Sequence, residues 1–198
     1  MGLPHRREQD HYTYADYQRW DDDQRWELID GHAWLMAPAP TSYHQIVAFE
    51  IGHQIRNALK EKPCTVLLAP IDVRLPRPGQ ADEEVDTVVQ PDVLVVCDPA
   101  KIDRRGVNGA PDWVVEVLSP ATAGHDQIVK RQLYERAGIP EYWLVHPVDR
   151  VLTIYRLENG HYGLPDIREL SGVTPIDALA GIEIVWEDII SRLPPQED

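Results

Sequence analysis

Two short apolar segments of the chain each carry one carboxylate at a position where a carboxylate is costly. Asp92 comes directly before the run Val93-Leu94-Val95-Val96, and Glu116 lies inside the run 113–118. Both runs are rich in β-branched residues and predict buried strands. An ionised carboxylate in apolar surroundings costs several kcal/mol unless a metal ion or hydrogen bonds compensate it. Two such groups on neighbouring strands therefore predict a divalent-metal site, and such a site suggests hydrolysis.

A lysine on the following helix would complete this site. Asp126, Lys130 and Tyr134 stand four residues apart within a helix predicted over 125–137, so their side chains share one face. Only a short connection separates this helix from the second carboxylate strand. We therefore expect the helix to fold back, so that Lys130 reaches the ends of the two carboxylate strands.

The predicted catalytic set is Asp92, Glu116 and Lys130. The two carboxylates would hold Mg²⁺ or Mn²⁺, because these hard cations prefer oxygen ligands. Lys130 would orient or activate the attacking water and counter the charge of a phosphate group.

The elements that must position these residues predict a mixed α/β fold with a central sheet covered by helices. A chain of 198 residues is most simply one domain, and we expect polar tails at 1–12 and 193–198 around a single domain at 13–192. In chain order, the expected elements are a helix from Thr13, strands at 26–29 and 33–36, a helix after Thr41 or Ser42, a strand over 64–75, a loop over 76–90 that could be a lid, the carboxylate strands, the helix at 125–137, a strand at 142–145, a hairpin from Val151, and a strand and short helix over 182–192.

The long helix after Thr41 or Ser42 shows partly helical spacing of its apolar residues. We expect this helix to bury four of them against the sheet, namely Ile46, Phe49, Ile55 and Leu59.

An ordered series of short motifs runs along almost the whole chain. The motifs are Glu27-Leu28-Ile29-Asp30-Gly31, the helix-opening His44, Pro91-Asp92-Val93, the run 115–120, the set Asp126/Lys130/Tyr134, and the run 137–145. In these residues the chain resembles the Uma-two family of proposed endonucleases, within the PD-(D/E)XK, or restriction-endonuclease-like, superfamily. The resemblance covers roughly residues 13–190. It implies a restriction-endonuclease-like fold, in which a mixed central β-sheet is flanked by helices.

One position departs from the pattern of the superfamily. A lysine usually stands two residues after the second acidic residue, and here that position is Leu118. The resemblance implies that the lysine has moved to the following helix, which makes Lys130 its natural replacement. The predicted metal ligands are Asp92, Glu116 and a main-chain carbonyl at Val117.

Three further residues are candidates for the site, each with a structural alternative. Glu27 would either pair across its hairpin or give a carboxylate to the metal. His44 would either make a hydrogen bond at the start of its helix or line the cleft. Asp126 would either be a favourable charge at a helix N-terminus or orient Lys130.

Structural interpretations also exist for residues around the two carboxylate strands. Asp92 follows a proline and would cap a turn in the simplest alternative. Asp112 stands four residues before Glu116, on the same face of an extended strand, and is the alternative metal ligand. Tyr134 is a core residue by default.

The net charge of -14 argues against broad electrostatic binding to nucleic acid. Local clusters such as Lys101, Arg104 and Arg105 nevertheless leave room for a basic patch. The sequence holds no phosphate-binding or dinucleotide-binding glycine motif, no Gly-x-Ser-x-Gly elbow and no zinc-like spacing.

Compartment and membrane association can also be predicted from composition. No apolar stretch approaches the roughly 20 residues that a bilayer requires, and the N-terminus lacks the apolar core of a signal peptide. Cys64 and Cys97 lie beside β-rich runs and are expected to be reduced core residues. The expected compartment is therefore the cytoplasm.

The leading hypothesis is a metal-dependent endonuclease that hydrolyses phosphodiester bonds of DNA. One alternative is an inactive nuclease-fold module for binding or assembly, which Leu118 and the acidic net charge favour. Another is a hydrolase of a different phosphate ester, such as RNA or a nucleotide. An exposed apolar edge around residues 142–157 would support a homodimer.

Overall fold

The computed structural model describes residues 11–21, 23–37 and 39–195. The predicted tails at 1–12 and 193–198 lie largely outside these ranges, although Tyr12 is buried and donates its main-chain N–H to Gly31. The elements are α1 (Tyr14–Tyr17), β1 (Trp26–Ile29), β2 (His32–Leu35), α2 (Ser42–Ala58), β3 (Thr65–Leu68), β4 (Val73–Arg74), η1 (Asp82–Glu84), β5 (Val88–Val89), β6 (Val93–Val96), η2 (Pro99–Lys101), β7 (Ile102–Asp103), β8 (Gly106–Asn108), β9 (Trp113–Val117), η3 (His125–Lys130), α3 (Arg131–Ala137), β10 (Glu141–His146), β11 (Val151–Glu158), β12 (His161–Tyr162), β13 (Asp166–Glu169), β14 (Val173–Pro175), β15 (Glu183–Val185) and α4 (Trp186–Ile190).

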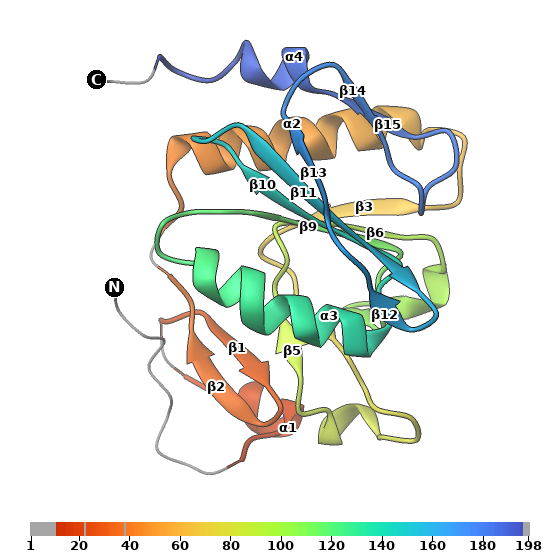
Figure 1. Cartoon of the computed structure of the whole chain (residues 1–198). Coiled ribbons are helices and arrows are strands. Elements are labelled where there is room, and N and C mark those ends of the chain that lie inside the picture. Colours follow the sequence, from red (N-terminus) through yellow and green to blue (C-terminus); the bar gives the residue numbers. More distant parts are fainter. Residues whose placement is uncertain (1–10, 22, 38, 196–198) are drawn as a thin grey trace.

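A seven-stranded mixed sheet forms the centre of the molecule. Its order is β12-β11-β10-β9-β6-β3, with β13 paired to β11, and only β9 and β10 run parallel among the pairs in this sheet. Figure 1 shows α2 on one side of this sheet and α3 on the other. The predicted mixed α/β fold with a helix-flanked central sheet is thus confirmed.

A second sheet of short strands carries the N-terminal hairpin. Its order is β2-β1-β5-β4-β8-β7, and Leu28 of β1 pairs with Val88 of β5. The hairpin turn at Asp30 and Gly31, both with positive φ, agrees with the prediction. This sheet brings β1 close to the beginning of β6 in the larger sheet, since β5 leads into β6 through only three residues.

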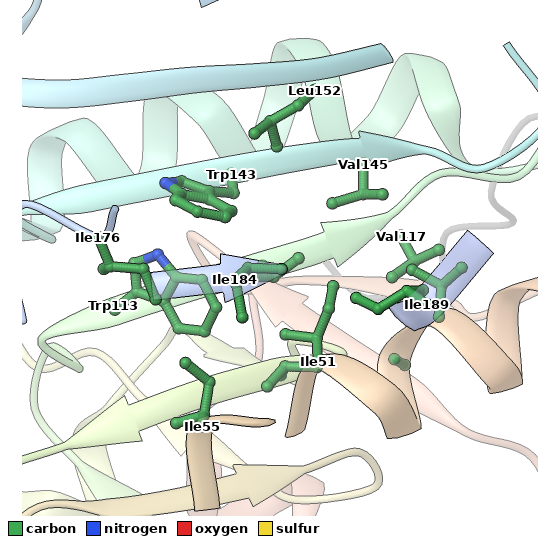
Figure 2. Packing of buried hydrophobic residues seen from close by; sticks show 14 of the residues in the cluster. Ile51, Ile55, Trp113, Val117, Trp143, Val145, Leu152, Ile176, Ile184 and Ile189 are labelled. Carbon is green, nitrogen blue, oxygen red and sulfur yellow. The ribbon is translucent and has the colours of Figure 1, made fainter. Parts of the chain in front are cut away.

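The largest apolar cluster lies between α2 and the central sheet. Trp113 and Trp143 meet edge to face with ring centroids 5.1 Å apart, and Figure 2 shows Ile51 and Ile55 in the same cluster. The predicted buried positions Ile55 and Leu59 are confirmed.

Two predicted core positions on α2 are wrong. Phe49 is 61% exposed, and Ile46 is only half-buried. Val47, Ala48 and Ile51 face the sheet instead. The buried stripe is therefore rotated by about one residue from the predicted one.

Alternation along β6 and β9 assigns their side chains to opposite faces. Val93 and Val95 pack against α2, whereas Leu94 and Val96 belong to the cluster that includes Leu133 of α3. Successive strand residues point to opposite faces, so even-numbered positions of both strands face α3.

Three other expectations require correction. The strand predicted over 64–75 is two strands, β3 and β4, which belong to different sheets. The loop predicted over 76–90 contains η1 and β5, and its second half, residues 85–90, is buried rather than lid-like. The apolar edge expected around 142–157 is not an edge, because β10 and β11 each pair with strands on both sides.

The prediction of two reduced cysteines is also wrong. Cys64 and Cys97 form a disulfide bond. Thr65 pairs with Val96 in antiparallel β3 and β6, so the two cysteines lie opposite each other just beyond the paired residues. Disulfides are uncommon in reducing compartments, and the cytoplasmic location stays a prediction. No helix within the described ranges is long and apolar enough to cross a membrane.

The corrected orientation of α2 predicts how two substitutions differ. Ile51→Ala should lower the free energy of unfolding by about 2–5 kcal/mol, because it opens a cavity in the core. Phe49→Ala, two residues earlier on the same helix, should change it by less than about 0.5 kcal/mol. Urea denaturation followed by circular dichroism measures both, and equal losses would contradict this packing.

Candidate active site

Strand pairing brings the two predicted carboxylates together. Val93 of β6 is opposite Val115 of antiparallel β9, so the next pair outward is Asp92 opposite Glu116. Both positions are even-numbered and face α3, as the alternation above requires. The prediction that these two carboxylates lie on neighbouring strands is confirmed.

The helix after β9 supplies the partners of Glu116. Lys130 Nζ lies 3.0 Å from Glu116 Oε1, and the Tyr134 hydroxyl donates to the same oxygen at 2.8 Å. These residues come from the π-helical segment η3 and from α3, which continues it until Gly138 adopts a positive φ of 80°. The predicted fold-back of this helix is confirmed, and π-helical turns are frequent at functional sites.

Glu27 of β1 joins the same group of charges. Its Oε1 lies 2.9 Å from Lys130 Nζ and accepts the Gln90 main-chain N–H at 2.9 Å. Its Oε2 lies 3.3 Å from Nε2 of His125. Glu27 therefore does not pair across its hairpin, and both of its oxygens are engaged.

His125 is a member of the site that the sequence did not indicate. It stands 98 residues from Glu27 in the chain, and no spacing rule connects the two positions. Its ring packs against Trp34, with centroids 5.1 Å apart, and that contact helps to fix its orientation. The one signal in the sequence is its place at the start of the helix that carries Lys130.

Asp92 is held from two sides. His44 Nε2 lies 3.0 Å from Asp92 Oδ2, and the Val117 main-chain N–H donates to the same oxygen at 2.8 Å. His44 lies in the first turn of α2, where the hydroxyl of Thr41 accepts the His44 main-chain N–H. The structure thus shows the predicted helix-start hydrogen bond of His44 and, in addition, a contact between its ring and Asp92.

The two remaining acidic candidates lie in different places. Asp126 Oδ1 is 3.6 Å from Lys130 Nζ, inside the cluster. Asp112 shares a strand face with Glu116 but lies four residues away, roughly 13 Å along the strand. Its Oδ2 accepts the Cys97 main-chain N–H at 2.7 Å, a structural contact far from the other carboxylates.

The cluster contains more negative groups than positive ones. Glu27, Glu116, Asp126 and Lys130 are each less than 5% exposed. Burial opposes the charge of Glu27, but Lys130 and His125 together lower the pKa of Glu27 to about 2. Burial, and then the nearby carboxylates, raise the pKa of Glu116 well above its usual value despite Lys130.

Burial and neighbouring charges also shift the pKa values of Asp126, Tyr134 and Lys130. Burial raises the pKa of Asp126, and burial together with Glu116 raises the pKa of the Tyr134 hydroxyl. Burial would lower the pKa of Lys130, but Glu116, Glu27 and Asp126 raise it well above the usual value. Lys130 is therefore charged and matched by Glu27, which leaves Glu116 without a counter-ion of its own.

The donor set fits a hard divalent cation. Both hydrogen bonds of Asp92 end on Oδ2, and those of Glu116 end on Oε1. Among the described residues, no hydrogen bond or ion pair ends on Asp92 Oδ1 or Glu116 Oε2, so these two oxygens remain for a ligand. Oxygen ligands and excess negative charge suit Mg²⁺ or Mn²⁺. Within the described ranges, no group of three or more His, Cys, Asp or Glu side chains is placed so that it could hold a metal ion, so a cation here would rest on the two carboxylates together with main-chain oxygen or water.

Comparisons with known proteins show which family the chain resembles over most of its length. The family model Uma2, described as "Putative restriction endonuclease", matches residues 14–187. An uncharacterized protein of Synechocystis sp. (strain ATCC 27184 / PCC 6803 / Kazusa), slr1290, is 27% identical over 150 residues, which cover 71% of each chain.

A solved structure shares the fold. The crystal structure of a "putative nuclease belonging to DUF820" from Anabaena variabilis matches with a TM-score of 0.70 at 19% identity. The match covers 91% of this chain and 98% of that chain. The predicted restriction-endonuclease-like fold is thereby confirmed.

The buried lysine predicts a large, pH-dependent effect on stability. Lys130→Met should lower the free energy of unfolding by about 3–5 kcal/mol at neutral pH, because it leaves buried carboxylates uncompensated. Such carboxyl groups have raised folded-state pKa values, so stability is lost as pH rises above the unfolded value. The deficit should therefore be larger near pH 8 than near pH 5.

Urea unfolding at both pH values measures this deficit. Lys60→Met, which removes an exposed lysine just beyond the end of α2, is the control and should be nearly neutral. A deficit that is small, or independent of pH, would contradict the charge balance described above.

Proposed function

The chain belongs to the Uma2 family, whose model is described as "Putative restriction endonuclease", and from this premise we propose that it is a metal-dependent endonuclease acting on DNA. The observation that carries the proposal is the pairing of Asp92 with Glu116 on one sheet face, with Lys130 Nζ 3.0 Å from Glu116. Two carboxylates with a lysine beside them suit hydrolysis of a phosphodiester bond.

The proposed cation is Mg²⁺ or Mn²⁺, held by Asp92 Oδ1, Glu116 Oε2 and the main-chain carbonyl of Val117. When bound, such a cation neutralises developing charge on a phosphate and lowers the pKa of a water molecule. His44 and the Val117 N–H orient the Asp92 carboxylate, and Tyr134 orients that of Glu116. These contacts engage one oxygen of each carboxylate, and we expect the two free oxygens to face a common cation.

Lys130 is the proposed catalytic cation. Its ammonium group has three donors, and Glu27 and Glu116 each accept one in the free protein. The remaining donor can orient the attacking water or bind a phosphate oxygen. Because Lys130 stays charged, it stabilises negative charge that develops on the phosphate rather than accepting a proton.

Glu27 is proposed to position Lys130 and not to bind the metal. Both oxygens of Glu27 are engaged, by Gln90 and Lys130 on one side and by His125 on the other. A low pKa of about 2 keeps the carboxylate charged, so it can anchor the ammonium group throughout a reaction.

The test of the function is nicking of supercoiled plasmid DNA by the purified protein with Mg²⁺ or Mn²⁺. The parent protein should nick, and Glu116→Gln and Lys130→Met should each lose on the order of 100-fold or more in rate. Glu61→Gln, which changes an exposed carboxylate beyond the end of α2, should retain full activity.

Each contrary outcome has a definite meaning. Nicking that survives in Glu116→Gln would overturn the proposed site. A parent protein that nicks with neither metal, but cleaves RNA or a nucleotide, would assign it to another phosphate ester. Failure on all substrates would identify a nuclease-fold binding module.

A second measurement separates positioning from metal binding. Glu27→Gln should lower kcat about tenfold or more while the Mn²⁺ concentration for half-maximal nicking stays unchanged. Asp92→Asn should raise that Mn²⁺ concentration, because it removes a proposed ligand. If Glu27→Gln raises the metal requirement as much as Asp92→Asn does, then Glu27 is a ligand and the positioning role is wrong.

A further inference from the structure

A cavity of about 360 Å³ is connected to the candidate active site through Gln90. The main-chain N–H of Gln90 donates to Glu27 Oε1, whereas its side-chain amide donates to Asp72 Oδ1 at 2.9 Å. The other walls come from the turn between β3 and β4 and from the turn between β7 and β8, which lie side by side because β4 pairs with β8. One residue thus contacts both the catalytic cluster and the cavity.

Asp72 presents a free hydrogen-bond acceptor at this cavity. The Tyr17 hydroxyl and the Gln90 amide both donate to Oδ1, at 3.0 and 2.9 Å, and no contact within the described residues ends on Oδ2. Tyr17 and Gln90 therefore fix the plane of the carboxylate. Burial raises the pKa of Asp72, and no cation of the described residues lies within ion-pair distance of it.

Arg104 presents a free cation at the same cavity. It is exposed at the β7–β8 turn and makes no hydrogen bond or ion pair with any described residue. Its neighbour Arg105 differs, because it pairs with Asp82.

A larger cavity of about 610 Å³ gives a useful comparison. It too contains two arginines, Arg77 and Arg136, but both are bound to the carboxylate of Asp30. Its cations are thus already neutralised, and of these two cavities only the smaller one offers an arginine without a partner among the described residues.

We propose that the smaller cavity binds one unstacked nucleotide of the DNA substrate, with its base on Asp72 Oδ2 and a phosphate on Arg104. The inference rests on the proposed function, since it names a substrate contact of the same nuclease. The volume lies at the lower end of the roughly 300–1,000 Å³ of ligand sites, which suits one nucleotide and not a duplex. Enzymes that read an unstacked base do so by hydrogen bonds to its exposed edge.

Guanine is the base that fits the free acceptor best. Its N1–H and N2–H groups lie side by side and can both donate to a carboxylate oxygen, whereas thymine offers one N–H on that edge. A carboxylate cannot donate in return, so bases whose edges consist mainly of acceptors are disfavoured. The cavity therefore predicts a preference for guanine at one position of the substrate.

The test is binding of two labelled oligothymidines, one of which carries a single central dG, to the full chain with Glu116→Gln and without metal. Fluorescence anisotropy should show about tenfold tighter binding of the dG-containing strand. Adding Asp72→Asn should abolish this preference. Adding Arg104→Gln should weaken the binding of both strands about equally and reduce the slope of log K against log salt concentration by about 0.7. The control Arg56→Gln changes an exposed arginine on α2 and should alter neither the binding nor this slope.

The contrary results are distinct from failure of the proposed function. Absence of a guanine preference in the parent, or binding by Arg104→Gln that equals the Arg56→Gln control, overturns the nucleotide site whether or not the protein nicks DNA. A guanine preference lost in Asp72→Asn supports the site even if nicking is never seen. Thermal unfolding checks that Asp72→Asn is folded, and if it is not, the exposed Arg104→Gln still tests the site.

Discussion

The arrangement of the site depends on a single buried ammonium group. Lys130 Nζ lies within 3.6 Å of Glu27, Glu116 and Asp126, which come from β1, β9 and η3. These elements belong to the smaller sheet, the larger sheet and the helix that covers them, so one charge joins three parts of the fold. A buried charge must be paired to be tolerated, and each carboxylate here requires the lysine as much as the lysine requires them.

Such a cluster is a poor source of net stability, because desolvation offsets most of the attraction between buried charges. The apolar clusters on either side of the central sheet stabilise the fold. The charged cluster around Lys130 therefore need not contain equal numbers of positive and negative groups. Excess carboxylate at Glu116 is the imbalance that a divalent cation would correct. Local arrangements that do not maximise stability, such as this excess of buried negative charge, are typical of functional sites.

Much of the site was predictable because it follows from strict periodicities. Alternation along two strands determines that Asp92 and Glu116 share a face, and four-residue spacing determines that Lys130 and Tyr134 point the same way. The contacts of Glu27 and His125 were not predictable in the same manner, since they depend on how the smaller sheet packs against the helix that follows β9. Phe49 and Ile46 were misassigned because apolar residues surround α2 on more than one side, and Cys64 with Cys97 because their pairing depends on strand register.

An acidic protein can still bind a nucleic-acid substrate if positive side chains without internal partners lie near the binding site. A net charge of -14 weakens non-specific attraction to phosphates over the whole surface. Many carboxylates, however, already have assigned partners, such as Asp30 with Arg77 and Arg136. Arg104, by contrast, has no partner among the described residues at a cavity that Gln90 connects to the buried charge cluster around Lys130. A nuclease of this kind would hold DNA through a few directed contacts near the site, and its affinity would therefore depend on the bases at those contacts more than on the length of the DNA.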